Sequence, residues 1–111
     1  MLKPISSTVL RNRIKKIRND LEFKLHNENI NGTLHGCSGF VIDPVHDHVV
    51  YVSTDLNHHT NTQAMYRTAR DAKDYRGGRN RFTSYDPDVL AQDIIDLLDD
   101  MAAGNVVHAR V

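Results

Sequence analysis

Histidine and cysteine are the residues of this chain whose chemistry is easiest to recognise. The sequence contains seven histidines and a single cysteine, Cys37. In a β-strand, His35 and Cys37 point to the same face, because side chains alternate between the two faces. If that strand pairs with the next β-rich run, Asp55 lies close to them, together with His58 or His59. Imidazole, thiolate and carboxylate groups all bind zinc, so His35, Cys37, His58 and His59 form a candidate metal site.

The spacing of these residues matches no strong zinc signature, since the chain has neither a paired CxxC nor an HExxH motif. The alternative is a buried cysteine that acts as a small hydrophobic residue, with the histidines at the surface. A nucleophilic site would pair Cys37 with His35 or His58 as its base. No orienting group or oxyanion donor is identifiable. We therefore predict no catalytic residue and keep a Cys/His zinc protein or small hydrolase as the third hypothesis.

A dense group of interaction-capable side chains lies between residues 66 and 82. Arginine binds phosphate or carboxylate through paired hydrogen bonds, and an aromatic ring stacks on a base or a guanidinium group. The amides of Gly77 and Gly78 would form a nest for an anion. The alternative is a solvated loop in which Arg67 or Arg70 pairs with the acidic C-terminal helix. The candidate binding residues here are Arg67, Arg70, Tyr75, Arg76, Arg79 and Arg81.

The C-terminal helix predicted below has an acidic outer face that includes Asp93, Asp96 and Asp100. A solvated helix face is the simplest explanation. The functional alternative is that these carboxylates bind the arginine and lysine groups that otherwise hold phosphates. The helix would then occupy a basic, nucleic-acid-binding groove of another protein.

Hydrophobic spacing predicts the elements that position these groups. Apolar residues at helical spacing from Leu10 to Leu25, after a cap at Ser6 or Ser7, predict one long helix. The β-rich runs 33–42 and 48–54 predict an antiparallel hairpin with Ile42 roughly opposite His48. In that register Cys37 faces Ser53. Glycines at positions 36 and 39 predict a bulge or a close approach by another backbone.

Two further helices and a short strand are predicted in the second half. The first helix runs from Thr60 or Asn61 to about Asp74 and ends at the following glycines. Asp86 and Pro87 start the last helix, whose buried stripe is Leu90, Ile94, Leu97, Leu98 and Met101. The tail 106–111 has strand character and would pair within the chain or across a homodimer. The prediction is a single domain, residues 1–111, of the α+β class: a long N-terminal helix, an antiparallel β-hairpin, two further helices and a C-terminal edge strand.

The charges of the chain are segregated along the sequence, although 14 basic and 14 acidic residues sum to zero. Basic residues concentrate in 1–26 and again in 67–81, whereas 27–66 contain no lysine or arginine. From residue 82 onward, six aspartates face a single arginine. Such segregation produces strongly charged surfaces and favours charged partners, without identifying them.

Composition narrows the class of protein. With 40% apolar and 25% charged residues, the chain resembles an ordinary globular domain. No apolar stretch approaches the length that spans a bilayer, and no hydrophobic signal segment begins the chain. A lone cysteine forms no disulfide within the chain, so the fold does not need an oxidising compartment. We therefore expect a cytoplasmic protein without membrane association.

Three stretches carry a resemblance: HGCSGFV at 35–41, YVST at 51–54 and YRTARDAKDYRGGRN at 66–80. Together they resemble small accessory proteins of phages and mobile elements, anti-CRISPR inhibitors among them. The resemblance implies a non-catalytic inhibitor or modulator that binds a host nucleic-acid-handling protein through charged surfaces. The alternative hypothesis is a direct nucleic-acid-binding accessory protein that uses the first helix and the 67–81 segment. No cofactor is expected other than the zinc considered above.

Overall fold

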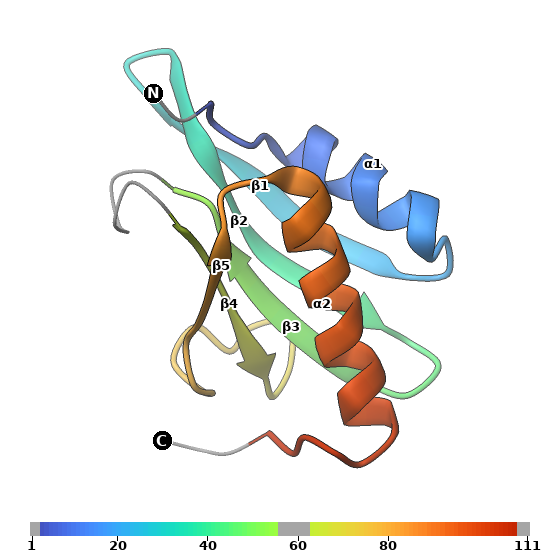
Figure 1. Cartoon of the computed structure of the whole chain (residues 1–111). Coiled ribbons are helices and arrows are strands. Elements are labelled where there is room, and N and C mark those ends of the chain that lie inside the picture. Colours follow the sequence, from blue (N-terminus) through green and yellow to red (C-terminus); the bar gives the residue numbers. More distant parts are fainter. Residues whose placement is uncertain (1–2, 56–62, 109–111) are drawn as a thin grey trace.

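The computed structural model describes residues 3–55 and 63–108, in which two helices cover one face of a five-stranded antiparallel sheet (Figure 1). The strands follow the chain order β1-β2-β3-β4-β5, so each pairs with its sequence neighbour. The elements are α1 (Ser7–Ile17), β1 (Glu22–Ile30), β2 (Thr33–Asp43), β3 (His48–Ser53), β4 (Gln63–Ala69), β5 (Arg81–Ser84) and α2 (Pro87–Ala102). The predicted α+β class is confirmed, but the number of strands and the layout differ from the prediction.

The first helix is shorter than predicted, because its second half is a strand. Ser6 caps α1 as expected, its side chain accepting a hydrogen bond from the N–H of Val9. The helix ends at Ile17, and residues 22–30 form β1. Leu21 and Leu25 fit a helical stripe, but with Phe23 they also fit the two-residue period of a strand. Pairing with β2 selects the second pattern.

The predicted β2–β3 hairpin is confirmed, with its register displaced by one residue. Asp43 pairs with His48, and Ser38 rather than Cys37 stands opposite Ser53. The close approach predicted at the glycines is confirmed too. Gly39 has φ +141°, and a Cβ placed there would lie 2.0 Å from the carbonyl oxygen of Lys24 on β1. Only glycine lets the two backbones come this close.

The helix predicted to run to about Asp74 is wrong, because residues 63–69 form β4 and pair with β3. Ala64, Met65 and Ala69 fit helical spacing, but the intervening β-branched and aromatic residues favour a strand. The segment predicted as a loop before Tyr85 contains β5, which pairs with β4. Thr60 and Asn61, the predicted caps of this helix, lie outside the described residues.

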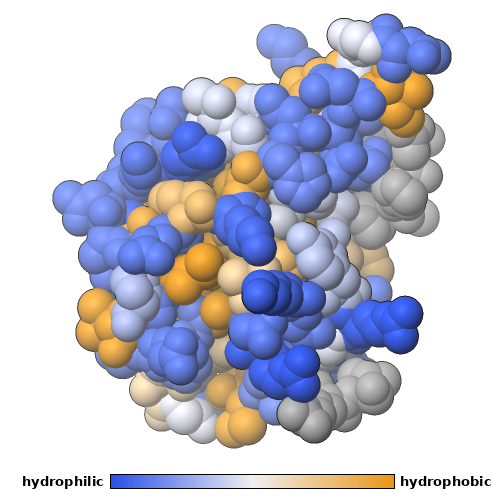
Figure 2. Space-filling model, turned by 180° about the vertical axis from the view of Figure 1, so that it is seen from behind, coloured by the Kyte–Doolittle hydropathy of each residue, from blue (hydrophilic) through white to orange (hydrophobic). Residues whose placement is uncertain are grey.

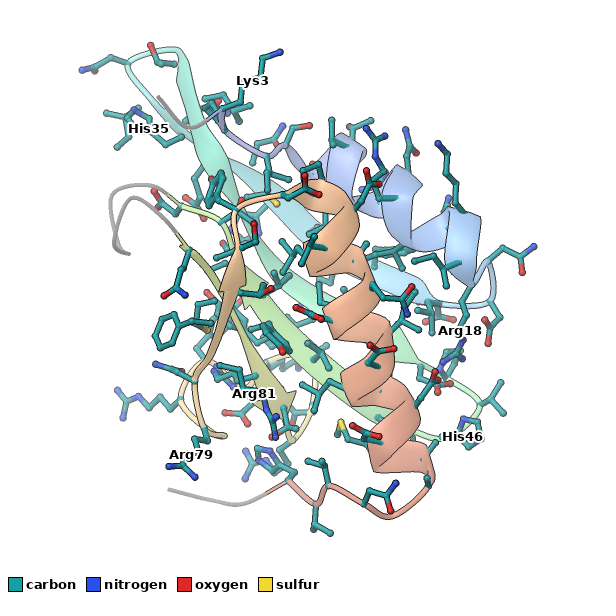
Figure 3. All side chains as sticks on the ribbon, in the orientation of Figure 1. Lys3, Arg18, His35, His46, Arg79 and Arg81 are labelled. Atoms are coloured by element: carbon teal, nitrogen blue, oxygen red, sulfur yellow. The ribbon has the colours of Figure 1, made fainter. Side chains whose placement is uncertain are left out.

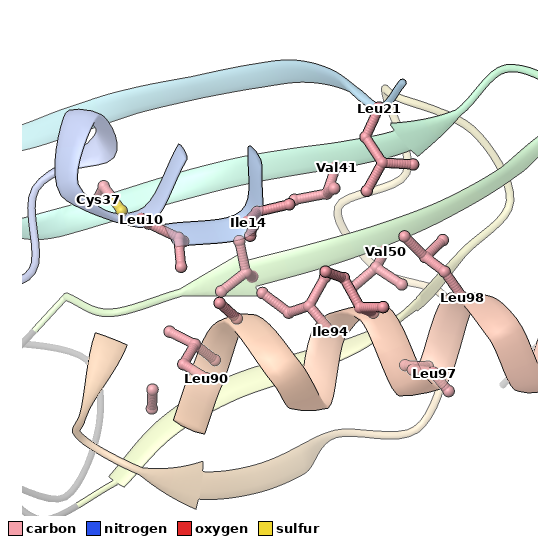
Figure 4. Close-up of a cluster of buried hydrophobic side chains, with 14 of the residues drawn as sticks. Leu10, Ile14, Leu21, Cys37, Val41, Val50, Leu90, Ile94, Leu97 and Leu98 are labelled. Carbon is pink, nitrogen blue, oxygen red and sulfur yellow. The ribbon is translucent and has the colours of Figure 1, made fainter. Parts of the chain in front are cut away.

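The last helix begins and packs as predicted. Asp86 accepts hydrogen bonds from the N–H groups of Asp88 and Val89, and Pro87 occupies the first turn. The five predicted stripe residues of α2 are all buried. They pack with apolar side chains of α1 and of the sheet into one core, shown in Figure 4, including Leu10, Ile14, Cys37, Val41, Val50, Leu90 and Ile94.

The predicted C-terminal strand does not appear in the part of the tail that the structure describes. Residues 106–108 form no strand, and 109–111 lie outside the described residues. Instead His108 turns back to β4, where its Nδ1 lies 2.9 Å from Oγ1 of Thr68. Neither described helix has the length and apolar character needed to cross a membrane.

Candidate functional site: the open sheet face and the basic loop

The face of the sheet opposite the helices, here called the open face, is partly covered by residues 70–80, here called the basic loop. Tyr75 of this loop packs edge-on against Phe40 and Tyr51, with ring centroids 5.1 Å and 5.9 Å apart. The Nζ of Lys24 on β1 donates to the carbonyl of Ala72 at 3.2 Å. The loop is therefore held to the sheet at several points, and aromatic pairs of this geometry are favourable.

Arg67 is the main anchor of the basic loop. It lies on β4, its side chain is buried, and its guanidinium carbon lies 4.5 Å from the Tyr51 ring centroid. Nη1 donates to the carbonyls of Thr68 and Gly77, and Nη2 donates to the carbonyl of Asp74. Burial lowers the pKa of Arg67, and the charge of Asp74 partly opposes this shift. One planar group thus holds the main chain just before the loop, at residue 68, and within it, at residues 74 and 77.

Asp74 organises the loop from within. Its Oδ1 accepts hydrogen bonds from the N–H groups of Arg76 and Gly77, and its Oδ2 accepts one from Arg70. These bonds, first the one from Arg70, hold the pKa of Asp74 at about 2, although burial opposes the shift. Of the two glycine amides predicted to form an anion nest, that of Gly77 donates to the chain's own Asp74 carboxylate.

The loop's cations project outward from this fixed backbone. Arg70 is exposed and lies 3.7 Å from Asp71. In residues 3–55 and 63–108, no carboxylate lies within 4.0 Å of the guanidinium groups of Arg76, Arg79 or Arg81. Figure 3 shows Arg79 and Arg81 at the β5 end of the loop. We call the exposed cations the basic loop surface: Arg70, Lys73, Arg76, Arg79 and Arg81.

The other basic and acidic blocks of the sequence lie beside each other on the helical face. Arg13 of α1 pairs with Asp88 at 2.9 Å, and Arg18 pairs with Asp99 of α2 at 3.3 Å. The alternative in which Arg67 or Arg70 pairs with the acidic helix is not seen among the described residues, because Arg67 binds main-chain carbonyls and Arg70 lies beside Asp71. Since α2 lies between α1 and β5 in Figure 1, the first helix and the basic loop do not form one continuous surface.

The acidic candidates on α2 have mostly local roles. The hydroxyl of Thr83 donates to Asp93, and Nε2 of Gln92 donates to Asp96 at 2.9 Å. Asp100 is exposed, and its main-chain carbonyl accepts hydrogen bonds from residues that follow the helix. The acidic face is therefore partly neutralised by α1 and partly used to hold α2 against β5.

Of the candidate metal and nucleophile residues, the structure describes His35 and Cys37. Cys37 is fully buried in the core, where its Sγ accepts from Oγ1 of Thr54 at 3.5 Å. Burial raises the pKa of the Cys37 thiol to about 11. His35 lies at the far end of β2, opposite the turn that carries His46 (Figure 3). His58 and His59 lie outside the described residues, and elsewhere no three His, Cys, Asp or Glu side chains gather as metal ligands.

A serine, a histidine and a glutamate meet on the open face, which sequence analysis did not foresee. Oγ of Ser38 donates to Glu28 at 2.6 Å and lies 3.2 Å from Nε2 of His26. That same Nε2 lies 3.0 Å from Glu28. A proton relay uses the two ring nitrogens for its two partners, and here one nitrogen serves both. The cluster therefore holds β1 to β2 rather than activating Ser38.

Beside this cluster the open face contains a cavity of about 420 Å³. Seen from behind, the open face shows hydrophobic patches among hydrophilic side chains (Figure 2). Sequence analysis missed much of this lining, because β1 and β4 were not recognised as strands. The two-residue alternation of Leu21, Phe23 and Leu25 was the available signal. The lining includes Glu28, Ser38, Tyr51, Met65, Arg67 and Arg76.

Comparison of the chain with protein-family models, with curated proteins and with solved structures finds no match.

Proposed function

We propose that this chain is a non-catalytic binding protein that engages its partner through the basic loop surface. The observation that carries the proposal is a fixed loop from which three arginines point outward with no carboxylate within 4.0 Å in the described part of the chain. Arg67 and Asp74 hold the backbone, while Arg76, Arg79 and Arg81 remain exposed. A preorganised charged surface loses less conformational entropy on binding than a mobile one.

The partner we propose is a nucleic-acid-handling protein of a host cell. An acidic surface of that protein would bind the basic loop surface in the cytoplasm. The resemblance to phage and mobile-element accessory proteins supports this choice, and the chain would then act as an inhibitor or modulator. Buried Cys37 and the Ser38 cluster favour binding over catalysis, because neither presents an activated nucleophile. The ion pairs of Arg13 and Arg18 with α2 compensate part of the basic charge of α1.

Direct binding of nucleic acid is the second candidate, and Tyr75 favours it. Tyr75 is 59% exposed and precedes Arg76 in the chain, an arrangement suited to stacking on a base next to a phosphate. The acidic helix α2 argues against direct nucleic-acid binding, because it borders the basic loop surface and would repel a long phosphate backbone. The short reach of the surface would limit binding to a few nucleotides.

Charge reversal at two exposed arginines tests the proposal. The tagged full chain and the double variant Arg79→Glu/Arg81→Glu are used to capture proteins from a nuclease-treated host lysate. We expect a nucleic-acid-handling protein to be retained by the wild type and lost with the variant. The matched control is Arg11→Glu/Lys15→Glu on α1, which changes the net charge by the same amount as the test variant. We expect this control still to capture the partner.

A parallel titration of labelled single- and double-stranded oligonucleotides separates the two candidates. Binding that weakens steeply with added salt and disappears in the Arg79/Arg81 variant would favour the direct binder. A partner retained equally by the wild type and the variant would contradict both candidates.

A further inference from the structure

Arg67 is a buried cation without an anionic partner among the described residues. It is 3% exposed, and its guanidinium group contacts three main-chain carbonyls and the face of Tyr51. Among residues 3–55 and 63–108, no carboxylate oxygen lies within 4.0 Å of it. Buried charges in proteins are normally paired, because an unpaired one loses its hydration without compensation.

Two N–H donors of Arg67 have no hydrogen-bond acceptor within residues 3–55 and 63–108. A guanidinium group carries five N–H bonds. The carbonyls of Thr68 and Gly77 use both bonds of Nη1, and the carbonyl of Asp74 uses one bond of Nη2. Nε–H and the second Nη2–H remain, and two donors are what one carboxylate group needs for paired hydrogen bonds.

Arg67 lines the cavity of about 420 Å³ on the open face, and that cavity is built from buried polar groups. Ser38, Ser53 and Asp55 are all buried where they line it, and Tyr51 covers the guanidinium from one side. Arg76 stands at the exposed rim. The floor of the cavity is therefore polar. A second guanidinium group, that of Arg76, lies where a ligand would enter.

Glu28 and Asp55 also line the cavity, and they restrict the charge of the ligand. A phosphate dianion would meet two carboxylates in the same small volume. A carboxylate carries a single charge, which Arg67 and Arg76 together offset. Both carboxylates would attract a ligand that also carries a positively charged amine.

We propose that the cavity on the open face binds a carboxylate group, held by Arg67 at the floor and by Arg76 at the rim. The carboxylate belongs either to a free small molecule with an amine, such as an amino acid, or to an acidic side chain of a bound protein. The site stands on the unpaired cation and the cavity, so it does not depend on the proposed function.

The direct test follows the Nε–Hε resonance of Arg67 in ¹⁵N-labelled full-length protein. Sodium acetate is the smallest probe, and sodium chloride at equal ionic strength is the control. We expect a saturable shift with acetate and only a small, linear shift with chloride. L-glutamate and the capped peptide Gly-Glu-Gly then distinguish the two sources. Tighter binding of glutamate identifies a free small molecule, and tighter binding of the peptide identifies an acidic side chain.

A matched pair of variants locates the site. Arg76→Gln removes a charge at the rim and should weaken acetate binding about tenfold, as expected for one charge-assisted hydrogen bond. Arg79→Gln removes the same charge from the same loop outside the cavity and should change affinity less than about twofold. Both variants keep Arg67 and the loop anchors.

Several results would overturn the site. These are no saturable acetate shift, an equal effect of Arg76→Gln and Arg79→Gln, or saturable binding of inorganic phosphate in place of acetate. The capture experiment changes Arg79 and Arg81, which do not line the cavity. The proposed function and the carboxylate site can therefore fail separately.

Discussion

The guanidinium of Arg67 lies over the ring of Tyr51, 4.5 Å from its centroid, and this pair joins the sheet to the basic loop. Tyr51 is on β3 and Arg67 is its cross-strand partner on β4. The ring holds the guanidinium flat, so that its edge meets the carbonyls of Asp74 and Gly77. A strand pair thereby determines the shape of a loop that begins after the strand has ended.

Replacing Arg67 by lysine should destabilise the protein by about 2–3 kcal/mol. An ammonium group places all its donors on one atom and cannot reach carbonyls of residues 68, 74 and 77 together. Urea unfolding followed by circular dichroism measures the loss. Arg79→Lys, an exposed change on the same loop, should stay within about 0.5 kcal/mol of the wild type. Equal stability of the two variants would show that Arg67 does not anchor the loop.

Asp74 should make the loop sensitive to acid. Its pKa is held at about 2 in the folded protein, below the value of the unfolded chain. Its contribution is therefore complete above about pH 4 and disappears as the pH falls through about 2. We expect Asp74→Asn to be less stable than the wild type at pH 6, with a difference that shrinks steadily below pH 4. A difference independent of pH would contradict this role of the carboxylate.

The sequence predicted those elements whose signals have one interpretation. The Asp86-Pro87 start and the apolar stripe of α2 occur at helical spacing without a strand alternative, and both are confirmed. The turn between Asp43 and His48 likewise separates two β-rich runs. In each case local propensity and tertiary packing favour the same structure.

The wrong secondary-structure predictions occur where one apolar pattern fits both the helical and the two-residue strand period. Leu21 and Leu25 are four residues apart, yet they also lie on one face of a strand, and only pairing with β2 decides between these. Met65 and Ala69, which are also four residues apart, misled in the same way on β4. The candidate cavity depends on both strands, so it could not be predicted. Neither could the role of Arg67, because its partners are carbonyls whose positions depend on the loop.

Asp43, at the end of β2, is a buried carboxylate with two cationic or polar side chains beside it. Its side chain is fully buried, 3.4 Å from Arg18 and 2.9 Å from Nδ1 of His46. Burial raises its pKa, but hydrogen bonds from His46 and the charge of Arg18 outweigh this and lower it overall.

Asp43→Ala should therefore cost about 3 kcal/mol, since it removes the acceptor of the turn and leaves Arg18 less compensated. Thermal and urea unfolding measure the loss. Asp20→Ala removes a more exposed partner of the same arginine and should have a clearly smaller effect. Similar losses for the two variants would mean that burial of Asp43 contributes little.

Cys37 should be unreactive in the folded protein, which distinguishes a core residue from a catalytic or metal-binding thiol. It is fully buried, and its pKa is raised to about 11. At pH 8 we expect a disulfide reagent to label the native chain at least about a hundredfold more slowly than the urea-unfolded chain. Cys37→Ala should retain partner capture and lose about 1 kcal/mol of stability through the small cavity it leaves. Fast labelling of the native chain, or slower labelling after added zinc, would restore the thiol as a functional group, because only an accessible thiolate reacts or binds metal.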